Sequence, residues 1–224
     1  MAKKNQTPVS QKEEIVNSSE AFVLKYQKVI TYVVVGILVV VAAFIGIKNY
    51  VIAPRAEKAS TELAKCQQLF AAEDFDNALK GNDKGCVGFL KIADDYGCTD
   101  AGNLAKLYAG LCYAQLGKAK EAEEFLEDFD ASDDAMISPA ALGALGNIYA
   151  TNGRLDDAVS VLKKAAAKAD NNSLSPTFLI QAGEILESQG KKSEALDMYK
   201  QIKEKYQNSM AYQDIDKYIE RVSE

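Results

Sequence analysis

The fold is decided by three similar stretches: YAQLGKAKEA at residues 113–122, YATNGRLDDA at 149–158 and LESQGKKSEA at 186–195. Each begins with tyrosine or leucine, has a glycine four residues later and ends with an alanine five residues after that glycine. The glycines are 36 and 37 residues apart. A recurring period near 34 residues indicates a chain built from repeated structural units.

Each unit is predicted to be a pair of helices joined by a turn. The glycine of each stretch would end the first helix in the left-handed conformation, which glycine adopts without penalty. Pro139 and Pro176 begin units two and three, and proline is tolerated in the first turn of a helix. Together with the period, this pattern is typical of tetratricopeptide repeats and predicts an all-α solenoid, since one hairpin cannot bury its own apolar face but stacked neighbours can.

A second set of glycines predicts close packing inside each pair. These glycines lie seven residues before the turn glycines, at Gly110, Gly146 and Gly183. We expect them to face the alanines of the second helices, which are Ala122, Ala158 and Ala195. A side chain in place of such a glycine would push the two helices apart, and overpacking of this kind costs about 1–3 kcal/mol.

The array extends on both sides of the three units. Residues 55–80 are predicted to form a long helix, with a second repeat helix starting near Phe75 and interrupted by the stretch from Gly81 to Gly88. We interpret residues 55–97 as a divergent first repeat with an inserted segment, which could be a partner loop or a tolerated bulge, because surface insertions are thermodynamically cheap.

Apolar residues at helical spacing also predict a final capping helix. They are Tyr212, Ile215, Tyr218, Ile219 and Val222.

An uncharged stretch near the start predicts one transmembrane helix. Between Lys28 and Lys48 lie 19 residues without a charge. At ~1.5 Å per residue this helix spans roughly 28 Å, about the thickness of the hydrocarbon core of a bilayer. A cleaved signal peptide is the rival interpretation, but its apolar core would normally be about 7–15 residues. The predicted regions are a tail at 1–28, a transmembrane helix at 29–47 and a repeat domain at 48–224.

Charge excludes some partners and leaves the orientation open. The 224-residue chain has a net charge of −6, and its acidic part follows residue 48. An acidic body gives no footprint for nucleic acid, which requires a basic stripe. Lysines and arginines lie on both flanks of the span, so the positive-inside rule does not decide its orientation.

The cysteines and the missing histidine argue against metal chemistry. There is no histidine, which removes the commonest general base and metal ligand. No two of the four cysteines have the C-X-X-C spacing, so a zinc site is not indicated. We expect Cys112 to be a small core residue. Cys86 and Cys98 flank a predicted helix and could form a bridge in an oxidising compartment. Whether any of Cys66, Cys86, Cys98 and Cys112 forms a disulfide stays open.

Nearly the whole chain resembles the YfgM-like family of membrane-anchored tetratricopeptide repeat proteins. The resemblance is carried by AGNLAKLYAG at 101–110, ISPA at 137–140 and DKYIER at 216–221. It implies a bacterial inner-membrane protein with one span, a cytoplasmic tail and a periplasmic repeat domain. It also implies ancillary work beside the Sec translocon (SecYEG) with periplasmic chaperones or client polypeptides as partners. Free thiols would be unusual in an oxidising periplasm.

Partner binding is expected on the concave face, which the first helices of a repeat array line. By helical phase the candidate residues are Leu107, Leu111, Gln115, Gly143, Asn147, Thr151, Ile180 and Glu184. No lysine or arginine stands among them, so the charge-assisted clamp on a terminal carboxylate is not expected. The surface would suit an apolar or uncharged segment of a partner protein. Alternatively, Leu107 and Leu111 merely pack inside the superhelix.

Catalysis is not expected. The glycines recur with the repeat and form no phosphate-binding loop, and the acidic pairs lie at helix ends and turns, where capping explains them. No catalytic residue, metal ligand, cofactor or small-molecule substrate is therefore predicted. The alternative binding function is an N-anchored protein-import receptor of an organelle's outer membrane, with its repeats facing the cytosol.

Overall fold

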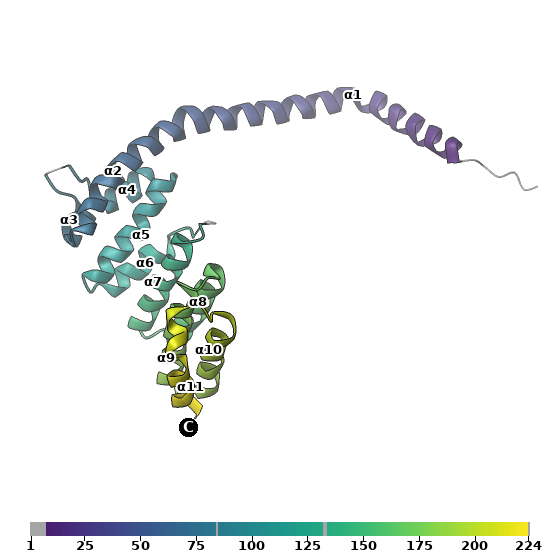
Figure 1. The fold of residues 1–224 in the computed structure, drawn as a ribbon. Coiled ribbons are helices and arrows are strands. Elements are labelled where there is room, and N and C mark those ends of the chain that lie inside the picture. The colour runs from purple at the N-terminus through teal and green to yellow at the C-terminus, as the bar shows by residue number, and fades with distance from the viewer. Residues whose placement is uncertain (1–7, 84, 132–133, 224) are drawn as a thin grey trace, which may run out of the picture. The chain divides into compact units, whose positions relative to one another are not determined.

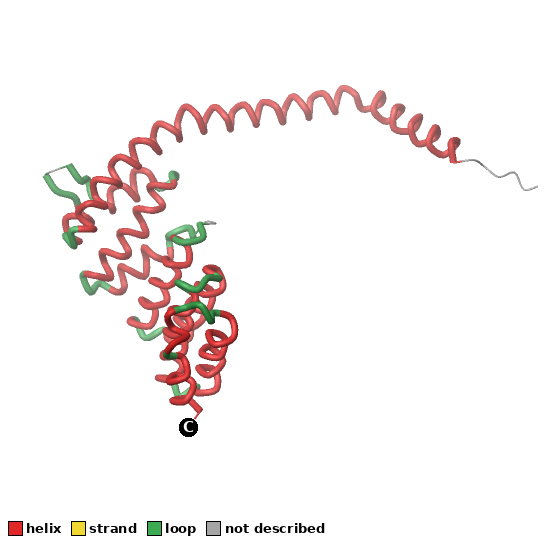
Figure 2. The backbone as a smooth tube through the Cα atoms, in the orientation of Figure 1, coloured by secondary structure: helices red, strands yellow, loops and turns green. Residues whose placement is uncertain are grey.

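The computed structural model describes residues 8–83, 85–131 and 134–223, with side chains from residue 25 onward; the first seven residues of the predicted tail lie outside it. The described residues form helices and no strand (Figure 2). The chain divides into two compact units, Met1–Pro54 and Arg55–Glu224.

The first unit is one long helix. α1 runs over Pro8–Ile47 and continues into the short π-helix η1 over Lys48–Ile52. Its apolar side chains between residues 29 and 47 are exposed throughout that stretch. Among the described residues, one helical stretch is long and apolar enough to cross a membrane, and its most apolar window has no part buried in protein.

The second unit is a stack of helices (Figure 1). From α4 to α11 each helix packs against the next in the chain. The helices are α2 (Ala53–Ala71), α3 (Phe75–Lys80), α4 (Phe89–Tyr96), α5 (Asp100–Gln115), α6 (Ala119–Glu127), α7 (Ile137–Thr151), α8 (Leu155–Ala169), α9 (Ser175–Ser188), α10 (Lys192–Lys205), the 3-10 helix η2 (Met210–Gln213) and α11 (Ile215–Ser223). The pairs α5/α6, α7/α8 and α9/α10 are the three predicted repeats, α2 with α3 and α4 is the divergent one, and α11 is the cap, which confirms the predicted fold class.

The repeated sequence builds the turn between the paired helices. In each pair the N–H of the residue after the turn glycine donates to the carbonyl of the first residue of the motif, at 2.9 Å from Lys118 to Tyr113 and 2.8 Å from Arg154 to Tyr149. The glycines themselves have φ between 73° and 80°. This is the Schellman arrangement at a helix C-terminus, which satisfies carbonyls that would otherwise lack partners. The spacing of tyrosine and glycine in the motif therefore encodes the geometry of the turn.

The packing glycines face the second helix one turn further along than predicted. A Cβ on Gly146 would lie 2.7 Å from Leu162 Cγ and 3.4 Å from the carbonyl oxygen of Ala158. At the corresponding positions of the other two pairs, a Cβ on Gly110 would lie against Leu126, and a Cβ on Gly183 would lie against the ring of Tyr199. Close approach of the two helices is as expected, but a large side chain fills the space over each glycine.

The divergent repeat confirms the predicted start of a second helix near Phe75, but the long helix predicted over 55–80 ends earlier. α2 ends at Ala71, and Glu73 has a φ of 59°, a conformation that no α-helix can contain. The chain turns back there, so α3 starts a second helix at Phe75. The inserted segment follows α3 and is closed by Gly81 and Gly88, both with positive φ.

The apolar core runs through the stack as three clusters, each shared by neighbouring pairs. Phe89 and Ile92 of α4 anchor the first cluster, Leu126 and Leu145 the second, and Tyr199 the third. Each pair thus buries its apolar face against the next, as a repeat array requires. Ile215 and Val222 of α11 close the last cluster, whereas Tyr212 lies in η2 and is 37% exposed.

Candidate functional site

The predicted binding residues lie at corresponding positions of α5, α7 and α9. Leu111, Asn147 and Glu184 occupy one such position and are 36 and 37 residues apart. Gln115 and Thr151 lie one turn further along α5 and α7. We call the first-helix face the surface made by Leu111, Gln115, Asn147, Thr151, Ile180 and Glu184. Gln115, Asn147, Thr151 and Glu184 are exposed, and Leu111 and Ile180 are half-buried.

Two of the predicted residues are part of the core instead. Leu107 is 7% exposed and belongs to the cluster between the first two regular repeats. Gly143 is buried, and a Cβ there would lie 2.2 Å from Cε1 of Phe178. Gly143 therefore makes room for an aromatic side chain of the next repeat. Both residues shape the stack and are left out of the first-helix face.

Uncharged side chains dominate the first-helix face. Thr151 donates its hydroxyl to the carbonyl of Asn147 at 2.9 Å, while no hydrogen bond of the Asn147 side chain is found among the described residues. Glu184 forms no salt bridge with any residue that the structure describes. On the same helix, Oε1 of Gln181 is buried without a hydrogen-bond partner in the described part of the chain. The helical spacing of the sequence did not identify Gln181, because a buried polar atom without a hydrogen-bond partner can be recognised only in the packed structure.

Ion pairs connect neighbouring repeats at their junctions. Arg154, in the turn before α8, binds Glu123 and Glu127 of α6 and stacks 4.1 Å from the centre of the Tyr149 ring. Tyr149 donates its hydroxyl to Glu127 at 2.7 Å. Burial, together with this bond, raises the pKa of Tyr149 to about 12. Lys191 binds Asp156 at 2.6 Å in the same way one repeat later.

The last junction fixes the capping helix. Arg221 of α11 holds Glu187 of α9 with two hydrogen bonds, 2.9 Å from Nε and 2.6 Å from Nη2. Tyr199 donates a third to the same carboxylate. Burial raises the pKa of Glu187, but the hydrogen bonds from Arg221 and Tyr199 outweigh it and leave that pKa below its usual value. These contacts tie the repeats together and leave the first-helix face free of them.

A disulfide anchors the inserted segment, and its pairing differs from the one considered above. Cys86 is bonded to Cys66 of α2, with Cα atoms 5.0 Å apart, and not to Cys98. Cys98 is free and exposed. Cys112 is free and fully buried, as predicted, and burial raises the pKa of its thiol to about 12. The pairing could not be found from sequence separation, because it depends on how the segment folds back onto α2.

The described residues offer no group of three or more histidine, cysteine, aspartate or glutamate side chains placed to hold a metal ion. What they offer chemically is a stack of helices with an exposed first-helix face that is mainly uncharged and carries the carboxylate of Glu184.

Comparison with known proteins agrees with this architecture. The model of the family described as "Tetratricopeptide repeat-like domain" matches residues 21–220. Two solved structures share the fold. One is the "nearly identical TPR-like repeats" of a Podosopora anserina kinesin light chain, with 13% identity, a TM-score of 0.57, and 75% of this chain and 86% of that one covered. The other is MamA, with 16% identity, a TM-score of 0.51, and coverage of 70% and 92%. No curated protein is matched.

Proposed function

The chain belongs to the tetratricopeptide repeat-like domain family, and we propose that it is a membrane-anchored scaffold that binds other proteins through its first-helix face. Repeats of this kind generally mediate protein–protein interaction. The fold is typical of non-enzymatic scaffolds, and no catalytic role is proposed for any residue.

The observation that carries the proposal is the contrast between two surfaces of the stack. At the junctions between repeats, the side chains of Arg154, Lys191 and Arg221 form ion pairs with carboxylates of the stack. Asn147, Thr151 and Glu184 are exposed and take part in none of these pairs. A surface that is free of internal ion pairs can be desolvated by a partner without breaking the stack.

The composition of the face indicates the kind of partner. With no basic residue on it, the face lacks the cationic donors that form charge-assisted hydrogen bonds to a terminal carboxylate. Leu111 and Ile180 contribute half-buried apolar surface beside amide and hydroxyl groups. An extended or helical segment with apolar and uncharged side chains fits this surface best.

Affinity isolation of the full-length chain in mild detergent tests this function. Wild type should co-purify with one or a few proteins, and the double variant Asn147→Arg/Thr151→Arg on the face should lose them. The matched control is Ser160→Arg/Ala167→Arg, at exposed positions of α8. If the face variant and the control retain the same proteins, the first-helix face is not the binding surface.

We further propose that residues 29–47 span the bacterial inner membrane, with the tail 1–28 in the cytoplasm and the repeat domain 48–224 in the periplasm. Two features support this placement. The apolar side chains of α1 between residues 29 and 47 are exposed, and no described residue buries them in a core. The Cys66–Cys86 disulfide is expected to persist in an oxidising compartment and to be reduced in the cytosol. The second feature disfavours a cytosol-facing import receptor.

The resemblance to YfgM-like proteins narrows the proposed partners to the Sec translocon, periplasmic chaperones and emerging polypeptides. These partners require the repeat domain to lie in the periplasm. Labelling of Cys98 can test this, because Cys98 is exposed and is not part of the disulfide. A membrane-impermeant maleimide added to cells with a permeabilised outer membrane should label Cys98 before the inner membrane is broken. Labelling only after lysis would put the repeats in the cytosol.

A further inference from the structure

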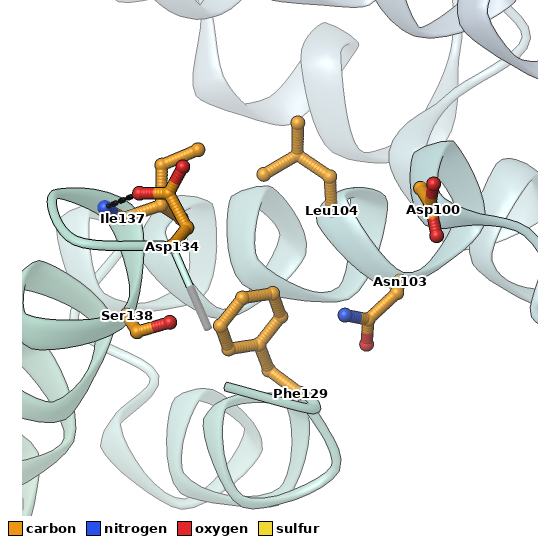
Figure 3. Close-up of a pocket in the computed structure, with 7 residues that line it drawn as sticks. All are labelled: Asp100, Asn103, Leu104, Phe129, Asp134, Ile137 and Ser138. Atoms are coloured by element: carbon orange, nitrogen blue, oxygen red, sulfur yellow. Dashed lines mark hydrogen bonds between the residues drawn. The ribbon is translucent and has the colours of Figure 1, made fainter. Parts of the chain in front are cut away.

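We propose a second docking surface, which receives an apolar side chain flanked by lysine or arginine in a partner polypeptide. It is a groove between the first turns of α5 and α7, and it shares no residue with the first-helix face (Figure 3). Seven residues line it, and we call it the α5–α7 groove. They are Asp100, Asn103, Leu104, Phe129, Asp134, Ile137 and Ser138.

The groove is apolar where a partner would insert. Figure 3 shows Leu104 and Phe129 between Asp100 and Asn103 on one side and Asp134 and Ile137 on the other. Ile137 is 39% exposed, and its neighbour Met136 is 60% exposed. Large apolar side chains with this exposure, placed next to a cavity, are typical of a protein-binding patch.

The walls of the groove are held in place before any partner arrives. Asn103 binds the backbone of Asp130 with both amide atoms, donating from Nδ2 to its carbonyl and accepting its N–H at Oδ1, each at 2.9 Å. This pair of bonds holds Asp130 against α5 and so positions the neighbouring Phe129. Asp134 accepts the N–H groups of Met136 and Ile137 at 2.8 and 2.6 Å and so fixes the start of α7. A preformed site loses less entropy on binding.

The size of the groove indicates one side chain of a polypeptide. Its cavity volume is about 250 Å³. Sites for small molecules and cofactors usually enclose about 300–1,000 Å³. A single leucine, isoleucine or phenylalanine side chain, inserted from a chain that passes over the opening, suits this volume better than a free ligand.

The charges at the rim select the flanking residues. Neither Asp100 nor Asp134 is in a salt bridge with another described residue. Backbone hydrogen bonds hold the pKa of Asp134 below its usual range, so this carboxylate stays charged. The chain beyond residue 48 is acidic overall, with 20 basic and 29 acidic residues. Both the rim and the wider field therefore attract cationic segments and repel acidic ones.

Random twelve-residue peptides displayed on phage, panned against the full-length chain in detergent micelles, test the proposal. The recovered peptides should share an apolar residue next to lysine or arginine. Their enrichment should fall at least about tenfold on the double variant Asp100→Asn/Ile137→Ser. Asn is chosen to remove the charge with little change in shape, and equal thermal midpoints would show that the variant folds.

Two controls separate this surface from the others. Asp94→Asn/Met210→Ser makes the same kinds of change at exposed positions outside the groove, and should retain the enrichment. Asn147→Arg/Thr151→Arg should also retain it; if it alone abolishes binding, these peptides bind the first-helix face and the groove proposal is wrong. Neutral or acidic consensus peptides, or no enrichment, would also overturn it. A change in sedimentation of the groove variant, without loss of peptide binding, would identify a second copy as the occupant and contradict the proposal.

Discussion

At the scale of single residues, glycines set how closely the paired helices approach. Gly110, Gly146 and Gly183 recur at the same place, and each has a large side chain of the second helix lying over it. The recurrence was visible in the sequence. Which side chain lies over each glycine was not, because it depends on the rotation of one helix against the other.

Replacing Gly146 with leucine tests this contact. Its Cβ would lie 2.7 Å from Leu162 Cγ, so the helices or the leucine must shift. Overpacking costs about 1–3 kcal/mol, and we expect the thermal midpoint of the full-length chain in detergent to fall by roughly 3–10 °C. Ala167→Leu, at an exposed position of α8, is the control and should leave the midpoint nearly unchanged. Equal midpoints for both variants would mean that Gly146 has room.

The carboxylate of Glu187 predicts a loss of stability in acid. Because its pKa in the folded chain lies below the ordinary value of 4.5, the folded state favours the charged form. Its contribution is fully present above pH 4.5 and is lost as the pH falls through the lower folded-state pKa. Urea midpoints measured between pH 7 and pH 3 should fall more steeply for wild type than for Glu187→Gln. The exposed Glu204→Gln is the control; a wild-type slope equal to that of Glu187→Gln would contradict the role of the Arg221–Glu187 contact.

At the scale of elements, the regular repeats were predictable and the divergent one only partly so. Glycine marks the C-terminal ends of α5, α7 and α9, and proline marks the starts of α7 and α9, since each acts locally on the backbone. The break after Ala71 has no such marker: Glu73 takes a positive φ although neither glycine nor asparagine stands there. Leu107 likewise does not belong to the binding face, because it packs between two repeats. The helical spacing within one repeat does not show such packing.

The disulfide between α2 and the inserted segment predicts an effect on stability. It closes a loop with a sequence separation of 20 residues, and loops near this size give about 3 kcal/mol in the chain-entropy model. The variant Cys66→Ser/Cys86→Ser should therefore unfold roughly 5–10 °C below wild type in non-reducing buffer. Adding reductant should lower wild type to the same value.

Cys98→Ser is the matched control for this change, because Cys98 is exposed and outside the bridge. It should unfold at the wild-type temperature and remain sensitive to reductant. A double serine variant as stable as wild type would show that the bridge does not form in the purified chain, and would remove it as support for an oxidising compartment.

At the scale of the whole molecule, the surface of α1 differs in kind from that of the repeat domain. The apolar side chains of α1 between residues 29 and 47 are exposed, whereas the repeat unit buries apolar side chains in three core clusters. This division was predictable because an uncharged stretch and a repeat period are both properties of the sequence as a whole. The partner was not predictable in the same way, since recognition depends on a few exposed side chains.

Photo-crosslinking in native membranes tests the central claim most directly. A photo-reactive residue is placed in the full-length chain at Asn147 or Glu184 on the first-helix face, and at the exposed Lys163 or Lys200 of the second helices. The scaffold function predicts discrete crosslinks to another protein from Asn147 and Glu184, and far fewer from Lys163 and Lys200. Equal crosslinking from all four positions, or crosslinks from the second helices alone, would contradict it.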